Sequence, residues 1–183
     1  MRNLSLIVLF ILVSFQTQAH IRFMYININP VSCQNNTYEI ELNYTMDNSS
    51  DILFGSIELE FGDGEMYIFN PSNPFDNQYV LINNEQGLYK FKKEHTYSGP
   101  GKYRLSARNF NRSPDIKNMQ NSVNTPFYVE TLVTIDPFLG CNHTPDLENV
   151  PFLRNKSDQH YFTDFSFIDE ENDSLSFHFT TAM

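Results

Sequence analysis

The sequence of 183 residues contains no tryptophan, two cysteines and seven glycines, and it is poor in basic residues. It has 12 Lys and Arg against 22 Asp and Glu, which gives a formal net charge of -10 at pH 7. Nucleic acids and anionic membranes bind proteins through Lys and Arg, so this charge disfavours both as partners. Two isolated cysteines also lack the paired spacing of a zinc or iron–sulfur site. The composition therefore favours a protein with other partners.

The sequence motifs of familiar catalytic sites are missing as well. There is no G-x-S-x-G elbow, no H-E-x-x-H and no cysteine-protease nucleophile segment. The histidines are scattered without the spacing of metal ligands. Carboxylates are abundant, so the residue counts alone do not exclude the pair of catalytic carboxylates that a glycosidase needs. The sequence, however, does not indicate an architecture that forms a cleft. We therefore predict that the protein is not an enzyme.

An apolar run at the N-terminus has the form of a secretory signal peptide. Arg2 provides the positive end, residues 4–13 provide the apolar stretch, and Thr17-Gln18-Ala19 provides the small residues that signal peptidase reads. The run is short for a membrane span, which needs about 20 apolar residues; an uncleaved anchor is the alternative. We predict a signal peptide at 1–19, cleavage before His20, and a secreted or cell-surface protein with no transmembrane segment after cleavage.

Export would place Cys33 and Cys141 outside the reducing cytosol, where a disulfide between them is chemically permissible. Such a bridge would tie the first strand region to the end of the main domain. It would contribute about 4 kcal/mol to stability by restricting the unfolded chain. Two buried free thiols are the alternative.

Apolar and polar residues alternate along the chain with the period of two that is typical of half-buried strands. The pattern appears at residues 37–44, 57–61 and 103–107, while residues 127–135 are richer in β-branched side chains on both faces. Clusters of Asp, Asn, Gly and Pro separate these stretches, and no helical stripe is visible. We predict an all-β fold, an antiparallel β-sandwich, with a long surface loop over residues 106–126.

The composition changes after Asp136-Pro137. The stretch that follows is acidic and is punctuated by prolines, as a linker would be. Two further strands are expected at residues 161–167 and 175–179, but two strands cannot bury a core alone. This stretch therefore packs on the first domain, pairs with another chain or belongs to a truncated module. We predict a sandwich domain at 20–138 and an incomplete β-module at 139–183.

Two turn motifs in fixed order resemble those of the polycystic-kidney-disease type (PKD) domain. The first is FGDG at residues 61–64, and the second is HTY at 95–97 followed by GPGKY at 99–103. Glycines permit positive backbone torsions, and the aspartate can accept hydrogen bonds from neighbouring amides. Leu59 stands where many members of the family have tryptophan. The resemblance implies an immunoglobulin-like sandwich whose turns are shaped by Gly62, Asp63, Gly64, His95, Tyr97, Gly101 and Tyr103.

The longer stretch from residue 121 to 142 is similar to exported, gliding-motility-associated surface proteins of outer-membrane bacteria. Residues 167–177 resemble the start of an immunoglobulin- or cadherin-like repeat that follows PKD-like modules in them. The resemblance implies a non-catalytic role in adhesion or as a spacer, with an extracellular protein or glycan as partner. One alternative is a truncated fragment of a larger adhesin. The other is an accessory carbohydrate-binding or hydrolytic protein. Burial of Tyr67, Phe69 and Phe75 would argue against this second alternative.

Two groups of charged residues are candidates for binding. Asp169, Glu171 and Asp173 alternate at a turn, where hard carboxylate oxygens suit a structural calcium ion, the one cofactor considered; a solvated acidic turn is the alternative. Basic residues gather between positions 90 and 117, where they suit an acidic polysaccharide or the acidic tail of a neighbouring molecule; ordinary solvated strand surface is the alternative. The predicted binding residues are Lys102, Arg104, Arg108 and Arg112.

Overall fold

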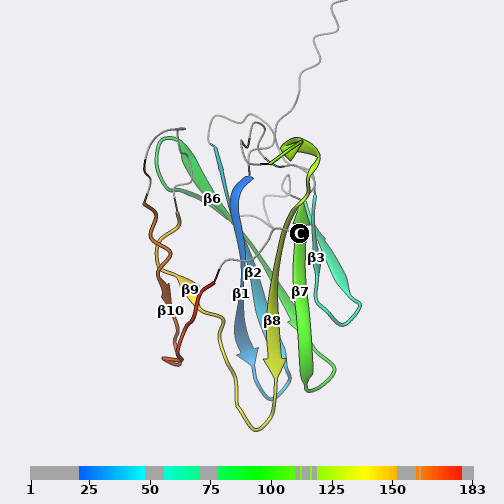
Figure 1. Cartoon of the computed structure of the whole chain (residues 1–183). Helices are drawn as coiled ribbons and strands as arrows, with labels where there is room; N and C mark the ends of the chain where they lie inside the picture. Colours follow the sequence, from blue (N-terminus) through cyan, green and yellow to red (C-terminus); the bar gives the residue numbers. More distant parts are fainter. Residues whose placement is uncertain are drawn as a thin grey trace, which may run out of the picture.

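The computed structural model describes residues 21–47, 56–70, 78–109, 119–151 and 162–178, together with Arg112, Ile116 and His160 (Figure 1). The predicted signal peptide at residues 1–19 lies outside these residues. Ten strands and one short 3-10 helix, Ser122–Asn124, occur in the described part, which contains no α-helix. No helix in those ranges is long and apolar enough to cross a membrane. The prediction of an all-β fold is confirmed.

One sheet, here called sheet A, has four antiparallel strands in the order β1-β2-β6-β5. Its strands are β1 (Ile21–Ser32), β2 (Thr37–Asp47), β5 (Gln78–Leu81) and β6 (Gln86–Thr96). Successive side chains of a strand point to opposite faces, so alternate residues of β2 turn toward the second sheet. Among these residues, Ile40, Leu42 and Tyr44 are fully buried.

The second sheet, sheet B, has four antiparallel strands in the order β4-β3-β7-β8. Its strands are β3 (Ile57–Glu60), β4 (Met66–Phe69), β7 (Gly101–Asn109) and β8 (Phe127–Ile135). The strands expected from the alternation are present. The loop was predicted to begin at residue 106, and this boundary was wrong. Strand β7 continues to Asn109, because Ser106, Ala107 and Asn109 are buried there.

The two sheets face one another, and the core lies between them (Figure 1). Aromatic rings fill much of this space: Phe69 of β4 stacks on Phe91 of β6 with ring centroids 4.7 Å apart, and Phe91 in turn stacks on Tyr44 of β2 at 5.6 Å. Each such side chain contributes about 1.5–3 kcal/mol when it is removed from water. These contacts hold together strands that are far apart in the sequence.

The chain after β8 returns along the outer face of sheet A (Figure 1). We call the described residues 139–151, His160 and 162–178 the C-terminal segment. It contains a short antiparallel pair, β9 (Asp146–Leu147) and β10 (Phe167–Ile168). Its contacts with sheet A include a hydrogen bond of 3.1 Å from the Thr144 amide to the Ile28 carbonyl.

Of the three alternatives for this stretch, packing on the first domain is the one that the structure contains. The prediction of strands at 161–167 and 175–179 was wrong for the residues that the structure describes. In the first stretch, strand pairing is limited to Phe167–Ile168, and in the second no strand occurs at residues 175–178. Leu175 and Phe177 alternate with polar residues, yet the backbone around them is not hydrogen-bonded into a ladder. Alternation alone therefore did not suffice to form a strand here.

Candidate binding site at the disulfide end

A disulfide between Cys33 and Cys141 closes one end of the sandwich, with the two Cα atoms 5.7 Å apart. It joins the turn between β1 and β2 to the loop that follows β8, across 108 residues of sequence. The same turn is tied to the end of β6 by a 3.0 Å hydrogen bond from the Tyr97 amide to the Asn36 carbonyl. Cross-links over long loops restrict the unfolded chain and so stabilise the folded one. The disulfide and the hydrogen bond together join three chain segments at this end.

The loop after β8, residues 136–140, is a closed turn. Asp136 accepts two backbone hydrogen bonds: its Oδ1 accepts from the Phe138 amide at 2.8 Å, and its carbonyl accepts from the Leu139 amide at 3.2 Å. Gly140 has a φ of +79°, a conformation that L side chains rarely adopt. These interactions fix the backbone of the loop beside the disulfide.

The tip of this loop presents two large apolar side chains to solvent. Phe138 is 95% exposed and Leu139 is 78% exposed. Single exposed apolar residues are common on protein surfaces, but an adjacent pair on a constrained loop is a suitable anchor for a partner. This pair was not predicted as a binding site, although the sequence shows two bulky apolar residues between Pro137 and Gly140.

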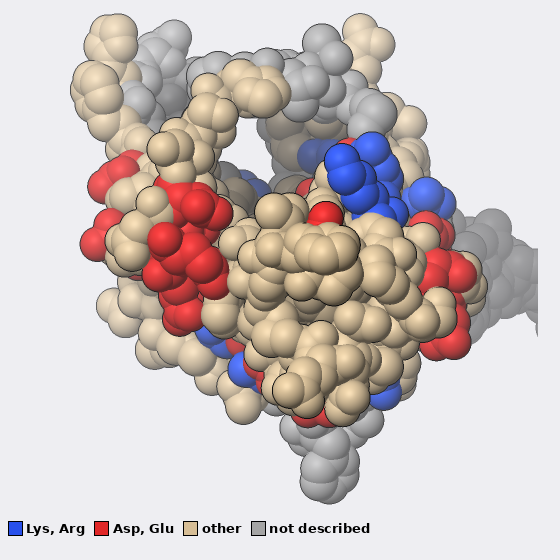
Figure 2. All heavy atoms as spheres, turned by 90° about the horizontal axis from the view of Figure 1, so that it is seen from below, with Lys and Arg blue, Asp and Glu red and all other residues tan. Residues whose placement is uncertain are grey.

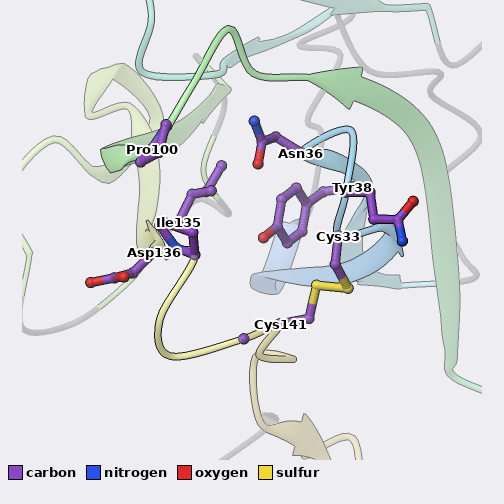
Figure 3. A pocket seen from close by; sticks show the side chains of 10 residues that line it. Cys33, Asn36, Tyr38, Pro100, Ile135, Asp136 and Cys141 are labelled. Carbon is purple, nitrogen blue, oxygen red and sulfur yellow. A yellow bond between two sulfur atoms is a disulfide. The ribbon is translucent and has the colours of Figure 1, made fainter.

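A hollow of about 440 Å³ lies next to the loop, between it and the turn that carries Cys33. Figure 3 shows Tyr38 and Asn36 on one side of the hollow and Ile135 with Asp136 on the other. Apolar surface from Tyr38 and Ile135 therefore lies beside the amide of Asn36 and the carboxylate of Asp136. Hollows that combine apolar walls with a few polar groups are typical of binding sites.

Two further hollows flank the loop tip. One, of about 490 Å³, is an open groove in which Phe138 faces Pro100 and Lys102. The other, of about 400 Å³, lies between Leu139 and the C-terminal segment, where His143 and Asp173 line it. The two exposed side chains of the tip thus have a depression on each side. Figure 2, which views the molecule from below, shows largely uncharged atoms at the centre of this end, with acidic atoms on both sides and a basic patch on one of them.

The acidic turn of the C-terminal segment is held by internal hydrogen bonds. The Asp173 amide donates to Asp169 Oδ1 at 2.7 Å, and Glu171 Oε1 lies 2.7 Å from Nδ1 of His143. Glu170 reaches the same imidazole, at 3.3 Å from Nε2. The hydrogen bond from His143 lowers the pKa of Glu171 below its ordinary value.

The predicted calcium site at Asp169, Glu171 and Asp173 is therefore not formed by this geometry. One carboxylate binds a backbone amide and another binds a histidine, so the three do not converge on a common point. Within the described ranges, no group of three or more His, Cys, Asp or Glu side chains is arranged to hold a metal ion. The arrangement is that of a hydrogen-bonded turn.

The four predicted basic binding residues do not form one surface. Lys102, Arg104 and Arg108 are exposed on the outer face of β7, where Arg104 makes an ion pair with Glu130 of the neighbouring strand β8. Arg112 lies elsewhere, with its guanidinium 4.6 Å from the ring centroid of Phe127 and its Nε 2.9 Å from the Pro126 carbonyl. Since Arg112 packs against the sandwich, burial lowers the pKa of its side chain.

The residues of the two turn motifs lie together. His95 Nε2 is 2.7 Å from Asp63 Oδ2, and the His95 ring stacks on Phe61 with centroids 4.0 Å apart. The Tyr97 hydroxyl donates to the Phe61 carbonyl at 3.2 Å, and Gly62, with a φ of +85°, packs against the backbone of Arg104. These contacts connect three strands.

The remaining motif residues lie nearby or shape the same turns. The Tyr103 hydroxyl donates to the Gly99 carbonyl at 2.8 Å, and the Tyr103 ring lies close to the position where a Cβ on Gly101 would be. Gly64 has a φ of +98° and no neighbour close to its Cα hydrogens. The residues of both motifs thus contribute hydrogen bonds, packing or backbone torsions.

The aromatic residues that an accessory carbohydrate-active protein would expose are largely buried. Phe69 is fully buried in the core, and Tyr67 is partly buried beneath the Lys93 ammonium, which is 4.3 Å from its ring centroid. Phe75 lies outside the described residues. These positions count against a sugar-binding platform built from these aromatic residues.

Comparison with known proteins gives no relative: no protein-family model, no curated protein and no solved structure matches the chain. The geometry of the molecule is therefore the basis for any functional conclusion.

Proposed function

We propose that the sandwich is immunoglobulin-like and of the PKD type. The strand order supports this: β1-β2-β6-β5 faces β4-β3-β7-β8, which corresponds to the A-B-E-D and C′-C-F-G sheets of immunoglobulin domains. The cluster of Asp63, His95 and Tyr97 supports the same assignment, because the two motifs that resemble the PKD family pack against each other.

We propose that the protein is an exported, non-catalytic module that binds an extracellular protein through its disulfide end. The observation that carries this proposal is the constrained loop that presents Phe138 and Leu139 between hollows. Large apolar side chains that enter a partner's pocket dominate the affinity of many interfaces. Asp136 and Asp173 lie beside the hollows, so a partner with basic groups around an apolar pocket is complementary.

Binding of the labelled exported protein to intact cells of its source tests this function. We expect saturable binding that falls at least tenfold when Phe138 and Leu139 are both changed to alanine. Phe162→Ala is the matched control, because Phe162 is 93% exposed but lies in the C-terminal segment. Absence of saturable binding, or an equal loss with Phe162→Ala, would contradict the proposed role of the loop.

Export is tested separately by sequencing the N-terminus of the protein recovered from the culture medium or the cell surface. We expect the chain to begin at His20. Recovery of only the uncleaved chain inside the cell would contradict export.

A further inference from the structure

The outer face of sheet A carries an ordered set of aromatic and polar side chains. On β1, Phe23 and Tyr25 point away from the core, with ring centroids 5.5 Å apart. Directly opposite them on β2 are Thr45 and Asn43, and Gln86 follows on β6. An aromatic edge on this face therefore borders a group of amide and hydroxyl side chains.

Three oxygen atoms of this polar group are buried without a hydrogen-bond partner in the described part of the molecule: Asn43 Oδ1, Thr45 Oγ1 and Gln86 Oε1. The residues are 0%, 0% and 1% exposed. Buried polar atoms nearly always have partners, and atoms that lack them are often found where a ligand or water binds. Asn43 Oδ1 and Gln86 Oε1 can only accept a hydrogen bond, whereas the Thr45 hydroxyl can both donate and accept, so a ligand group that does both, such as a hydroxyl, suits all three.

The C-terminal segment packs on this face, but its groups form hydrogen bonds with only some of the polar side chains there. The Phe165 ring lies over Phe23, with centroids 6.1 Å apart. The Pro151 carbonyl accepts a 3.4 Å hydrogen bond from Gln86 Nε2, and Asp146 accepts one from the side-chain amide of Asn27. The segment thus supplies one ring and two acceptors, and it leaves the three oxygens unpaired.

The cover is held much less firmly than the face beneath it. Among the described residues of the C-terminal segment, Pro151 is the one that is buried, and none belongs to the hydrophobic core. Segments with few buried contacts open locally at a small cost in free energy. The disulfide at Cys141 holds the start of the segment, so the part that follows can move away without detaching.

We propose that the C-terminal segment is a displaceable cover over a carbohydrate-binding face on sheet A. Sugar rings pack on aromatic side chains such as Phe23 and Tyr25, and each sugar hydroxyl can donate to the unpaired oxygens while it accepts from amide groups. Glu41 is paired with Lys90 at 2.9 Å and with Lys92 at 3.2 Å, so its charge is compensated and the ligand is a neutral glycan. This site is separate from the loop of Phe138 and Leu139.

Binding of the full-length exported protein to an array of neutral glycans tests the proposal. The variant Asp146→Ala/Phe165→Ala removes two contacts of the cover, and we expect it to bind the same glycans as the wild type with an apparent Kd about tenfold lower, because the open state is more populated. Adding Thr45→Val and Gln86→Leu to that variant removes two of the unpaired oxygens, and we expect binding to be lost.

The control for folding is the melting temperature. Thr45→Val replaces a buried, unpaired hydroxyl with a methyl group, so Tm should stay the same or rise by about 2–4 °C. Thr134→Val is the matched control on the exposed outer face of sheet B and should change neither Tm nor glycan binding.

If the wild type and Asp146→Ala/Phe165→Ala bound the neutral glycan with equal affinity, the proposal that the C-terminal segment acts as a cover would be wrong. The carbohydrate-binding face would be overturned if neither protein bound a neutral glycan, or if binding survived the loss of the two oxygens in a folded variant. Phe138→Ala/Leu139→Ala should retain glycan binding, which separates this test from that of the proposed function.

Discussion

The sandwich and the C-terminal segment differ in how they are held together. All buried hydrophobic residues in the described ranges lie between Ile21 and Ile135, whereas the segment after residue 138 exposes Phe162, Ile168 and Phe177. Asn43 and Thr45, on the outer face of sheet A, are nevertheless buried, and the C-terminal segment contacts this face at Phe23 and Asn27. The sandwich therefore provides the buried core of the molecule, whereas the C-terminal segment packs on a polar surface of that sandwich.

The two outer sheet faces show the consequence. Sheet B exposes Arg104 and Leu132 on its outer face, and Glu130 pairs with Arg104 there. The outer face of sheet A carries buried polar residues, among them the uncharged Asn43 and Thr45 and the carboxylate of Glu41, which is paired with Lys90 and Lys92. A face that is open to water can carry charges at low cost, whereas on a buried face a charge needs an oppositely charged partner and a neutral polar group needs a hydrogen bond.

The largest effect should come from the bond that links the two regions. Replacing both Cys33 and Cys141 with serine removes a cross-link spanning 108 residues, so the free energy of unfolding should fall by about 4 kcal/mol because the unfolded chain gains entropy. Urea unfolding at equilibrium measures this. A loss below about 1 kcal/mol would contradict a stabilising role for the bridge.

Truncation of a core side chain should separate the two regions next. Leu42→Ala in β2 should lower the free energy of unfolding by about 3 kcal/mol, since Leu42 is fully buried. Phe162→Ala in the C-terminal segment removes a larger side chain but should change it by less than about 0.5 kcal/mol. Similar losses for both variants, measured in urea, would show that the segment contributes to the core.

Two glycines of one turn should differ because of their surroundings. A Cβ on Gly62 would lie 2.6 Å from the backbone of Arg104, whereas a Cβ on Gly64 would meet no atom within 4 Å. Both have positive φ, so Gly64→Ala should cost about 1 kcal/mol and Gly62→Ala at least about 2 kcal/mol. Thermal unfolding compares the pair, and an equal shift in Tm would contradict the packing of Gly62 on β7.

The smallest effects should be the contributions of Asp63 and Asp146 to stability, which should change in opposite directions with pH. Burial opposes ionisation of Asp63, but hydrogen bonds from His95 and the Glu65 amide outweigh it and lower the pKa. The stabilisation from Asp63 is therefore present above about pH 4 and is lost as the pH falls through the lowered value. Burial, with the charge of Glu41, raises the pKa of Asp146, so its contribution is present below about pH 4 and is lost as the pH rises through the raised value.

Unfolding from pH 2 to 7 checks these responses in two isosteric variants. Asp63→Asn should lose stability at pH 7 and depend less on acid, whereas Asp146→Asn should be as stable as the wild type at pH 7. A clear loss of stability at pH 7 in Asp146→Asn would contradict the direction assigned to Asp146.

The sequence contained enough information for the strands whose two faces differ clearly. Residues 37–44, 57–61, 103–107 and 127–135 coincide with β2, β3, β7 and β8 to within a few residues. Strand β6 was not predicted, because Lys90, Lys92 and Lys93 obscure its buried positions in a local pattern. Strand β5 has four residues that are all exposed, so it carries no alternation of burial.

The candidate sites were less predictable for a different physical reason. Asn43 and Thr45 have the sequence pattern of a solvent face, yet they are buried, and a segment about a hundred residues later reaches the same face, where Asp146 accepts a hydrogen bond from Asn27. The resemblance named Asp63 and His95 as residues that shape two turns, but the hydrogen bond between them was not predicted. The distant contact between His143 and Glu171 had no such signal.

The central claim is that the C-terminal segment opens independently of the sandwich, and native-state hydrogen exchange on the full-length protein tests it most directly. The amides of Thr144 and Glu148, which donate to the Ile28 and Ser166 carbonyls, are compared with those of Leu42 and Phe91 in β2 and β6. We predict that the first pair exchanges at least about 100-fold faster, because local opening suffices to expose it. Exchange of all four amides at similar rates, after correction for intrinsic exchange, would show that the segment and the sandwich unfold as one unit.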